Sequence, residues 1–205
     1  PHRPRPPARR ATLAALADDL FQRAATCARC PGMKGRRRVL SRLNGSPEAE
    51  ILFVGEAPGR QGAELHGMPF HDDTAGRNFE QLLDAAALER DRVFVTNAVL
   101  CNPQTAAGNN RPPAAAEIAA CGTWLRETIQ VVDPGLVVAL GAVALRALAR
   151  IAPHDLRLSD AGKTVAWWNR RLAALYHPGA RARSHRSLEQ QIADWRRVFA
   201  GSAAG

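Results

Sequence analysis

The sequence predicts an α/β fold, a three-layer α/β/α sandwich around a central four-stranded parallel sheet. Four apolar segments read as strands covered on both faces, because their hydrophobic residues run continuously rather than alternating with polar ones. Helical patterns lie between these segments, and strands that alternate with helices are typical of parallel, doubly wound sheets. A chain of 205 residues suits one well-filled core. We therefore expect a single domain, with residues 1–10 and 201–205 frayed at its ends.

Each expected strand is a short apolar run bounded by turn residues. In chain order the runs are ILFVG, RVFVTNAV, GLVVALG and RLAALYHPG, and the last one ends in a Pro-Gly turn. The four strands are expected at residues 51–55, 92–99, 135–141 and 171–179.

The expected helices carry apolar residues at helical spacing. The first helix precedes the sheet and is expected to pack across it. The third is expected to begin at Pro112 and Pro113, because proline suits a first helical turn. The five helices are expected at residues 12–25, 75–88, 113–130, 142–150 and 187–199.

Polar residues stand where three of these strands end. Glu56 follows the first strand, Asn97 closes the second and His177 follows the fourth. The carboxyl ends of parallel strands share one edge of the sheet, where ligands bind in this class of fold, so the three side chains can converge on one crevice. Each also has a structural interpretation, as a turn carboxylate, an Asn closing a strand and a His capping a turn. Three such residues at one edge favour a functional site.

The composition favours a nucleic-acid partner. The net charge is +9, from 28 Lys and Arg against 19 Asp and Glu. A chain this basic attracts polyanions, since each phosphate that it neutralises releases condensed counterions. Arginine and alanine enrichment through codon bias is the alternative explanation of this charge.

The protein is expected to be cytoplasmic and associated with the nucleoid. No apolar run approaches the roughly 20 residues that a membrane span requires. The first residues, PHRPRPPARRATLAAL, are basic and proline-rich, without the apolar core or cleavage site of a secretory signal.

Four cysteines invite a metal centre. Cys27 and Cys30 form a Cys-x2-Cys pair followed by Pro31, whereas Cys101 and Cys121 are widely spaced. Disulfides are improbable in a cytoplasmic protein. Tetrahedral zinc and a four-iron, four-sulfur (4Fe-4S) cluster both use four thiolates, and the wide spacing suits the bulkier cluster. Buried free thiols are the third alternative.

Five motifs together resemble the uracil-DNA glycosylase superfamily. They are GEAPG at a strand end, TNAVLC, NRPP before a helix that carries a cysteine, VVALGAVA and HPG. Over residues 24–199 the chain is similar to the family 4 and family 5 members of that superfamily. The resemblance implies a 4Fe-4S cluster on Cys27, Cys30, Cys101 and Cys121, and the α/β sheet inferred above.

The resemblance also implies catalytic roles for Glu56, Asp73 and His177. Breaking an N-glycosidic bond builds negative charge on the base, and a neutral donor such as His177 stabilises it. The sugar becomes oxocarbenium-like, so a carboxylate stabilises it or orients water. Family 4 uses the position of Glu56 and family 5 that of Asp73, and this chain has both. Helix capping near Thr74 is the alternative role of Asp73.

The remaining implied roles are base recognition and DNA contact. A flipped base requires an aromatic platform, which the resemblance assigns to Phe70, and a hydrogen-bonding partner for its edge, which it assigns to Asn97. The base-binding residues implied are Ala57, Gly59, Phe70 and Asn97. The DNA-binding residues implied, in the segment HPGARARSHR, are Pro178, Gly179, Arg181 and Arg183.

Three departures from the family pattern bear on specificity. Family 4 usually has a carboxylate near the position of Gly62, so the glycine is expected to leave the pocket floor open. The last motif is HPG rather than the commoner HPS, which removes a hydroxyl. Residues 104–111, QTAAGNNR, lack the basic insert with a covalently bonding histidine that one related family carries.

The expected function is that of a monofunctional DNA glycosylase. It would act as a monomer on duplex or single-stranded DNA, excise uracil together with hypoxanthine and xanthine, and so initiate base excision repair. A non-catalytic iron–sulfur module that binds nucleic acid is the first alternative, and the missing serine of HPS supports it. A small-molecule enzyme is the second alternative. The arginine-dense segment HPGARARSHR disfavours it, because a small substrate does not need such a segment.

Overall fold

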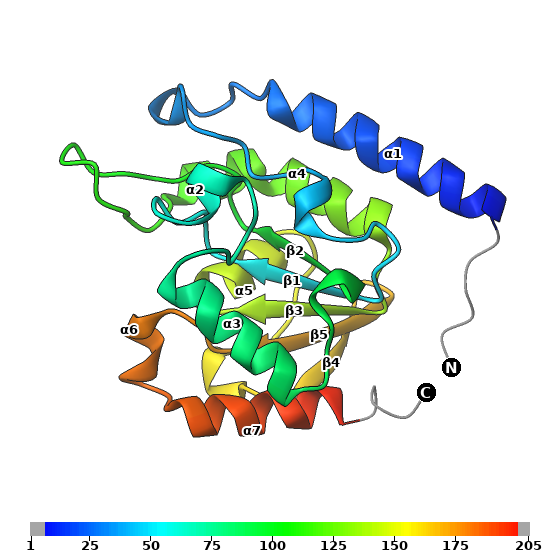
Figure 1. Ribbon diagram of the computed structural model, residues 1–205, viewed down its shortest axis with the longest axis vertical. Helices are drawn as coiled ribbons and strands as arrows, with labels where there is room; N and C mark the ends of the chain where they lie inside the picture. Colours follow the sequence, from blue (N-terminus) through cyan, green and yellow to red (C-terminus); the bar gives the residue numbers. More distant parts are fainter. Residues whose placement is uncertain (1–6, 201–205) are drawn as a thin grey trace.

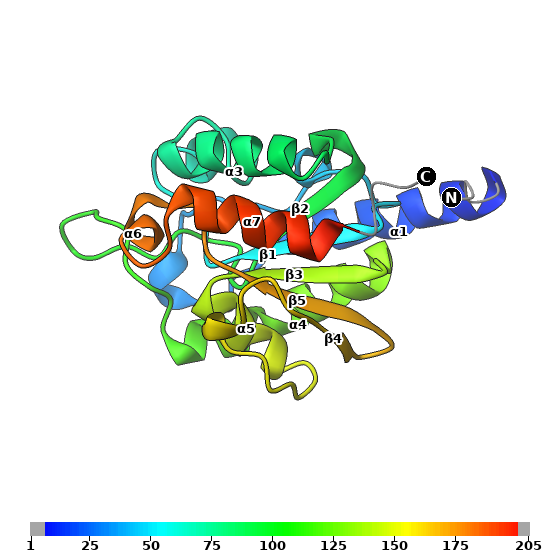
Figure 2. The ribbon, with the colours of Figure 1, turned by 90° about the horizontal axis from the view of Figure 1, so that it is seen from below.

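Five strands form one sheet with helices on both of its faces, as Figures 1 and 2 show for the computed structural model, which describes residues 7–200. Parts of the ends expected to fray, residues 1–6 and 201–205, lie outside the described residues. The strand order is β2-β1-β3-β5-β4. The strands are β1 (Ile51–Gly55), β2 (Val93–Asn97), β3 (Leu136–Leu140), β4 (Thr164–Trp167) and β5 (Arg170–Leu175).

The expectation of four parallel strands is wrong by one strand. β1, β2, β3 and β5 are parallel and match the four predicted runs, but β4 adds an antiparallel edge to β5. The two strands are joined by Trp168 and Asn169, both with left-handed backbone (φ 43° and 60°). Two-residue hairpins favour this conformation, usually with a glycine. The turn here has none, which hides the hairpin from a sequence pattern.

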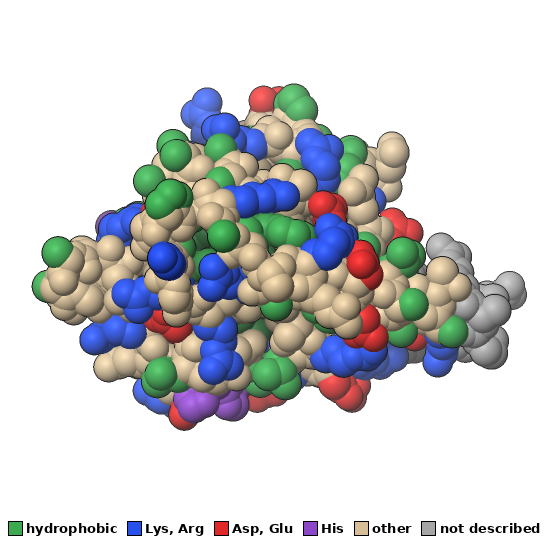
Figure 3. All heavy atoms as spheres, turned by 90° about the horizontal axis from the view of Figure 1, so that it is seen from above, with side chains coloured by type: hydrophobic (Ala, Val, Ile, Leu, Met, Phe, Trp, Pro, Cys, Tyr) green, Lys and Arg blue, Asp and Glu red, His purple; other side chains and the backbone are tan. Residues whose placement is uncertain are grey.

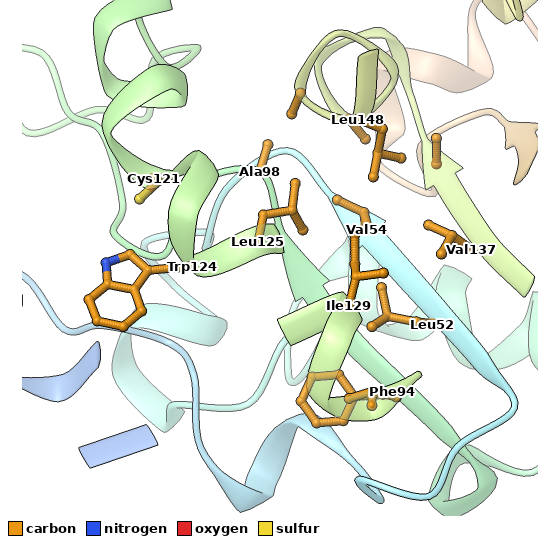
Figure 4. Close-up of a cluster of buried hydrophobic side chains, with 14 of the residues drawn as sticks. Leu52, Val54, Phe94, Ala98, Cys121, Trp124, Leu125, Ile129, Val137 and Leu148 are labelled. Carbon is orange, nitrogen blue, oxygen red and sulfur yellow. The ribbon is translucent and has the colours of Figure 1, made fainter. Parts of the chain in front are cut away.

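The helices cover the sheet in two layers, with α1, α4 and α5 on one face and α3 and α7 on the other (Figure 2). Continuous apolar strands supply both cores: Leu52 and Val54 point to one layer, and Phe53 points to the other. Figure 4 shows the first core, where Leu125 and Ile129 of α4 lie against β1. The helices are α1 (Pro7–Ala25), α2 (Ala63–His66), α3 (Thr74–Ala85), α4 (Ala115–Val132), α5 (Ala142–Ala149), α6 (Ala180–Arg183) and α7 (Leu188–Phe199).

Helix α1 starts earlier than expected and packs mainly along α4, as Figure 1 shows. Arg23 donates to Glu127 of α4 at 2.8 Å. One aromatic side chain reaches the sheet: the ring of Phe21 stacks on Phe94 of β2 with centroids 6.4 Å apart. The helix therefore closes the edge of the first core. Within residues 7–200, no helix is both long and apolar enough to cross a membrane.

Helix α4 begins at Ala115, so Pro112 and Pro113 precede the helix instead of forming its first turn. The Glu117 carboxylate caps this end by accepting from the backbone N–H of Ala114 at 2.7 Å. The same carboxylate accepts two hydrogen bonds from Arg111, at 2.6 and 2.8 Å. This pair anchors the chain that leads from the carboxyl end of β2 to α4.

Candidate active site and cysteine pocket

A cavity of about 470 Å³ opens at the carboxyl ends of the parallel strands. Its volume is within the roughly 300–1,000 Å³ typical of small-ligand sites. Glu56, Asn97 and His177 all line it, as their positions after β1, β2 and β5 predict. The strand register explains this convergence. Gly55 of β1 pairs with Asn97 of β2, so Glu56, the next residue of the chain, lies near Asn97.

His177 is a neutral imidazole with a defined donor. The backbone N–H of Gly179 donates to its Nδ1 at 2.9 Å, which leaves the ring proton on Nε2. Burial lowers the pKa of His177 to about 4, against an opposing contribution from Asp73. The ring is therefore uncharged at neutral pH and offers one N–H.

Gly179 makes this contact possible by its lack of a side chain. A Cβ at this position would lie 2.8 Å from Nδ1 of His177, closer than packed atoms tolerate. The glycine of HPG thus permits the backbone amide to approach the ring. Its departure from the commoner HPS has a structural reason beyond a lost hydroxyl.

Phe70 and Asn97 form further walls of the cavity. The ring of Phe70 stacks on Phe79 at 4.8 Å and lies 5.4 Å from the ring of His177. Its φ of 49° is uncommon outside glycine, and such outliers cluster at functional sites. Asn97 is 3% exposed, and no hydrogen bond within residues 7–200 occupies its side-chain amide. An aromatic platform and a free amide therefore face one space.

The Glu56 carboxylate is half-buried in the cavity. Burial raises its pKa, while the charges of Arg181 and Arg146 act in the opposite direction. In the part of the chain that the structure describes, no group donates a hydrogen bond to this carboxylate. It is thus available to a substrate or a water molecule.

Asp73 lines the same cavity and also caps helix α3. Its Oδ1 accepts from the backbone N–H of Gly76 at 2.7 Å, the capping geometry given above as its alternative role. Its second oxygen, Oδ2, lies against Gly59 and Gly62. Its negative charge also acts on His177, where it opposes the lowering of the pKa by burial. The carboxylate therefore combines a structural bond with a position near the candidate donor.

Gly62 does not open the floor of the cavity, contrary to the expectation. A Cβ at this position would lie 2.4 Å from the carbonyl oxygen of His71 and 2.7 Å from Oδ2 of Asp73. The space that a larger residue would fill is already taken by these oxygens. The glycine allows Asp73 to pack closely rather than widening the pocket.

The segment after β5 divides into cavity-lining and supporting residues. Gly179 and Arg181 line the cavity, whereas Pro178 and Arg183 do not. The predicted base-binding residues Ala57 and Gly59, which follow β1, also line it. The Pro178 carbonyl accepts from Nδ2 of Asn78 at 2.6 Å, and Arg183 donates to Oδ1 of the same Asn78 at 2.5 Å. These two bonds dock the segment onto α3. Of the two predicted DNA-binding arginines, Arg181 is the one that faces the cavity.

Several residues that line the cavity were not singled out from the sequence. They lie in the loop between β2 and α4 and in the segment around α6. Asn102 had one usable signal, since it directly follows Cys101 in the TNAVLC motif. The additional polar residues are Asn102, Asn110, Arg111, Tyr176 and His185.

The four cysteines line a second, small cavity between the segment that follows α1, the loop after β2 and helix α4. None forms a disulfide, and Nε1 of Trp124 donates to Sγ of Cys27 at 3.2 Å. Burial raises the pKa of Cys101 to about 11 and that of Cys121 to about 12. Within residues 7–200, no group of three or more His, Cys, Asp or Glu side chains is placed to hold a single metal ion. The thiols therefore surround a space without closing on one ion.

The sequence of this chain is similar to those of several known proteins. The sequence model of the uracil DNA glycosylase superfamily matches residues 44–198. A type-4 uracil-DNA glycosylase of Archaeoglobus fulgidus is 29% identical over 189 residues, which cover 88% of this chain and 90% of the relative. A type-5 uracil-DNA glycosylase of Pyrobaculum aerophilum is 31% identical over 189 residues, and the match covers 78% of this chain and 81% of the relative. A type-4 enzyme of Sulfurisphaera tokodaii is 35% identical, covering 66% and 62%.

Proposed function

This chain belongs to the uracil DNA glycosylase superfamily, and we propose that it is a monofunctional uracil-DNA glycosylase that initiates base excision repair. The observation that carries the proposal is the neutral His177, which carries its ring proton on Nε2 and lines the same cavity as Glu56, Asn97 and Phe70. A flipped base needs an aromatic platform, an amide for its edge and a donor for its developing charge. One cavity supplies all of these groups.

The proposed reaction is hydrolysis of the bond between N1 of uracil and C1′ of deoxyribose. The bonding electron pair leaves with the base, and the N–H at Nε2 of His177 stabilises the anionic charge at a carbonyl oxygen of uracil. Water adds to C1′ while the ionised Glu56 stabilises the oxocarbenium-like sugar and accepts the proton of that water. The uracil anion takes up a proton as Glu56 gives up the one it accepted, so the products are uracil and an abasic site.

Excision from defined oligonucleotides tests this proposal. Purified protein is incubated with duplex and single-stranded oligonucleotides that carry one uracil, and abasic sites are then cleaved with alkali. We expect a strand break at the uracil and none in the matched thymine substrate. Binding of uracil-containing DNA without cleavage would instead support the non-catalytic module. A cut that appears without alkali would contradict the monofunctional assignment.

We also propose that hypoxanthine and xanthine are substrates. The open floor at Gly62 no longer supports this extension, because Asp73 and His71 occupy that space. Support comes from the cavity volume of about 470 Å³, which has room for more than a pyrimidine ring. Oligonucleotides that carry either purine, treated in the same way, test it.

We propose that the cysteine pocket holds a 4Fe-4S cluster, as the type-4 and type-5 relatives suggest. The four residues fit the group, since they line one cavity, with Cys101 and Cys121 buried, and Arg29 and Arg38 also line it to balance its negative charge. When bound, the cluster would hold the thiols as thiolates and tie α1 to the loop before α4. It lies apart from the cavity with Glu56, so a structural role follows.

Metal analysis checks the cluster directly. We expect a brown protein with absorbance near about 400 nm and about four iron atoms per chain. Replacing Cys121 by Ala should remove the iron and lower the melting temperature, because its thiol is buried on α4. Zinc in stoichiometric amount, without iron, would contradict the assignment.

DNA binding should depend on salt and on Arg181. Basic side chains are spread over the face shown in Figure 3 rather than gathered in one patch, so the charge alone does not locate the interface. Arg181 is exposed at the mouth of the cavity. Arg181→Ala should weaken DNA binding across sequences and reduce the slope of log K against log salt by about one contact. Titrations with abasic-analogue DNA at several salt concentrations measure both.

Arg183→Ala is the matched comparison, because Arg183 is bonded to Asn78 outside the cavity. The sequence predicts that both arginines contact DNA phosphates. The structure makes Arg181 the stronger candidate, so the slope should change more for Arg181→Ala. Wild-type binding by both variants at every salt concentration would exclude this segment as the DNA contact.

A further inference from the structure

Asn102 is a polar residue buried in the wall of the active-site cavity, with 1% of its surface exposed. Its Nδ2 donates to the carbonyl oxygen of Pro58 at 2.6 Å and to Oδ1 of Asn110 at 2.9 Å. The same Oδ1 of Asn110 accepts from the backbone N–H of Arg60 at 3.2 Å. These hydrogen bonds join the turn at residues 56–60, called here the Glu56 turn, to the loop that follows Cys101.

The first part of the Glu56 turn is held by the chain just after β2. The backbone N–H of Ala98 donates to the Gly55 carbonyl at 2.9 Å, and that of Val99 donates to the Glu56 carbonyl at 3.3 Å. Pro58 has no N–H to contribute, and within residues 7–200 its carbonyl is held by the Asn102 side chain. Asn102 therefore fixes the part of the turn that the sheet does not reach.

The other end of the Asn102 amide supports a functional interpretation. Its Oδ1 is buried and has no hydrogen-bond partner among the described residues. A buried acceptor without a partner destabilises a fold, and such groups are rare enough to need an explanation. The donor side of this amide, which reaches the Glu56 turn directly at Pro58 and through Asn110 at Arg60, supplies one.

We propose that Asn102 is a positioning residue for N-glycosidic bond cleavage, which fixes the Glu56 carboxylate in the cavity that His177 also lines. Asn102 acts through the Pro58 carbonyl and the Asn110 amide and does not contact the base itself. Because it directly follows Cys101, it also connects the cysteine pocket with the Glu56 turn. The inference rests on the glycosylase function proposed above.

The test separates cleavage from binding and from stability. Asn102→Ala removes the two donated bonds, and Asn44→Ala is its matched control. Asn44 is also fully buried, and its Nδ2 donates to the Val95 carbonyl at 2.7 Å, but it does not line the cavity. Single-turnover cleavage of uracil-DNA, the dissociation constant for abasic-analogue DNA and the melting temperature are measured for both variants and the wild type.

We expect Asn102→Ala to cleave about tenfold to 100-fold more slowly in a single turnover, with its DNA dissociation constant within about twofold of wild type. Asn44→Ala should lose a similar amount of stability and cleave at the wild-type rate below its melting temperature. Asn110→Ala, a change at an exposed residue that spares the core, should slow cleavage in the same direction. It keeps the test valid if Asn102→Ala does not fold.

Two outcomes would overturn the proposal: wild-type cleavage by the Asn102 and Asn110 variants, or equal losses of cleavage in Asn102→Ala and Asn44→Ala. Failure of the glycosylase function itself is distinguishable, because the wild type would then leave uracil-DNA uncut. Asn102→Asp provides a further check. Its carboxylate faces two oxygens at 2.6 and 2.9 Å, so it should be slower than Asn102→Ala.

Discussion

His177→Ala is expected to cleave uracil-DNA about 100- to 1,000-fold more slowly than the wild type in a single turnover. This is the usual effect of removing one preorganised donor to a developing negative charge. The ring is preorganised here because the Gly179 amide fixes its tautomer and the ring of Phe70 packs 5.4 Å away. Binding of abasic-analogue DNA should change little, because the charge that His177 stabilises develops only as the bond breaks.

His154→Ala is the matched control for this variant. His154 is also a half-buried histidine, with Nε2 3.1 Å from the Leu145 carbonyl, but it does not line the active-site cavity. It should cleave at the wild-type rate. If His177→Ala retained more than about a third of the wild-type rate, the donor role would pass to another group.

The pH dependence of cleavage provides a second measure of the neutral histidine. Since the pKa of His177 is lowered to about 4, its charge does not change between pH 8 and pH 6. Burial raises the pKa of Glu56, so an acidic limb of the rate should report protonation of that carboxylate and vanish in Glu56→Gln. A limb near pH 6.5 that His177→Ala removes would show instead that the imidazole titrates normally.

The lowered pKa of His177 also affects stability with a definite sign. The unfolded chain takes up a proton near pH 6.5, while the folded chain does so only near pH 4. The free energy of unfolding should therefore fall as the pH drops from 6.5 to 4, because the unfolded state binds more protons in this range. His177→Ala should lose this part of the pH dependence in denaturant unfolding.

Much of the fold follows from local pattern alone. The four parallel strands are continuous apolar runs, which identifies them without knowledge of their neighbours. Strand β4 was missed because it is a short edge strand joined by Trp168 and Asn169, a turn without the usual glycine. The start of α4 was misplaced because a side chain, Glu117, caps it rather than the prolines.

The candidate site was predictable where strand ends determine it. Glu56, Asn97 and His177 converge because parallel strands end at one edge. The packing at Gly62 was not predictable, since the oxygens that fill that space belong to residues 71 and 73 on a later loop. The Asn102 amide donates to the carbonyl of Pro58, 44 residues away, and no local sequence pattern predicts such a hydrogen bond.

The two cavity carboxylates are expected to contribute unequally, with Glu56 the larger. Glu56 follows β1 directly, and no hydrogen bond within residues 7–200 occupies its carboxylate. One oxygen of Asp73 is committed to the N–H of Gly76, at 2.7 Å. Glu56→Gln should therefore slow single-turnover cleavage about 100- to 10,000-fold, the range of a positioned acid or base. Asp73→Asn keeps an oxygen for the cap and should slow it less.

Stability measurements separate the two roles of Asp73. Asp73→Asn should unfold like the wild type, while Asp73→Ala should lose about 1 kcal/mol of stability with the helix cap. Asp72→Asn, a change in the adjacent exposed carboxylate, is the control and should alter neither cleavage nor stability appreciably. Full activity in Glu56→Gln together with none in Asp73→Asn would transfer the catalytic role to Asp73. In that case the capping bond to Gly76 would hold the reacting carboxylate in place, because Oδ2 of Asp73 would remain free to face the sugar.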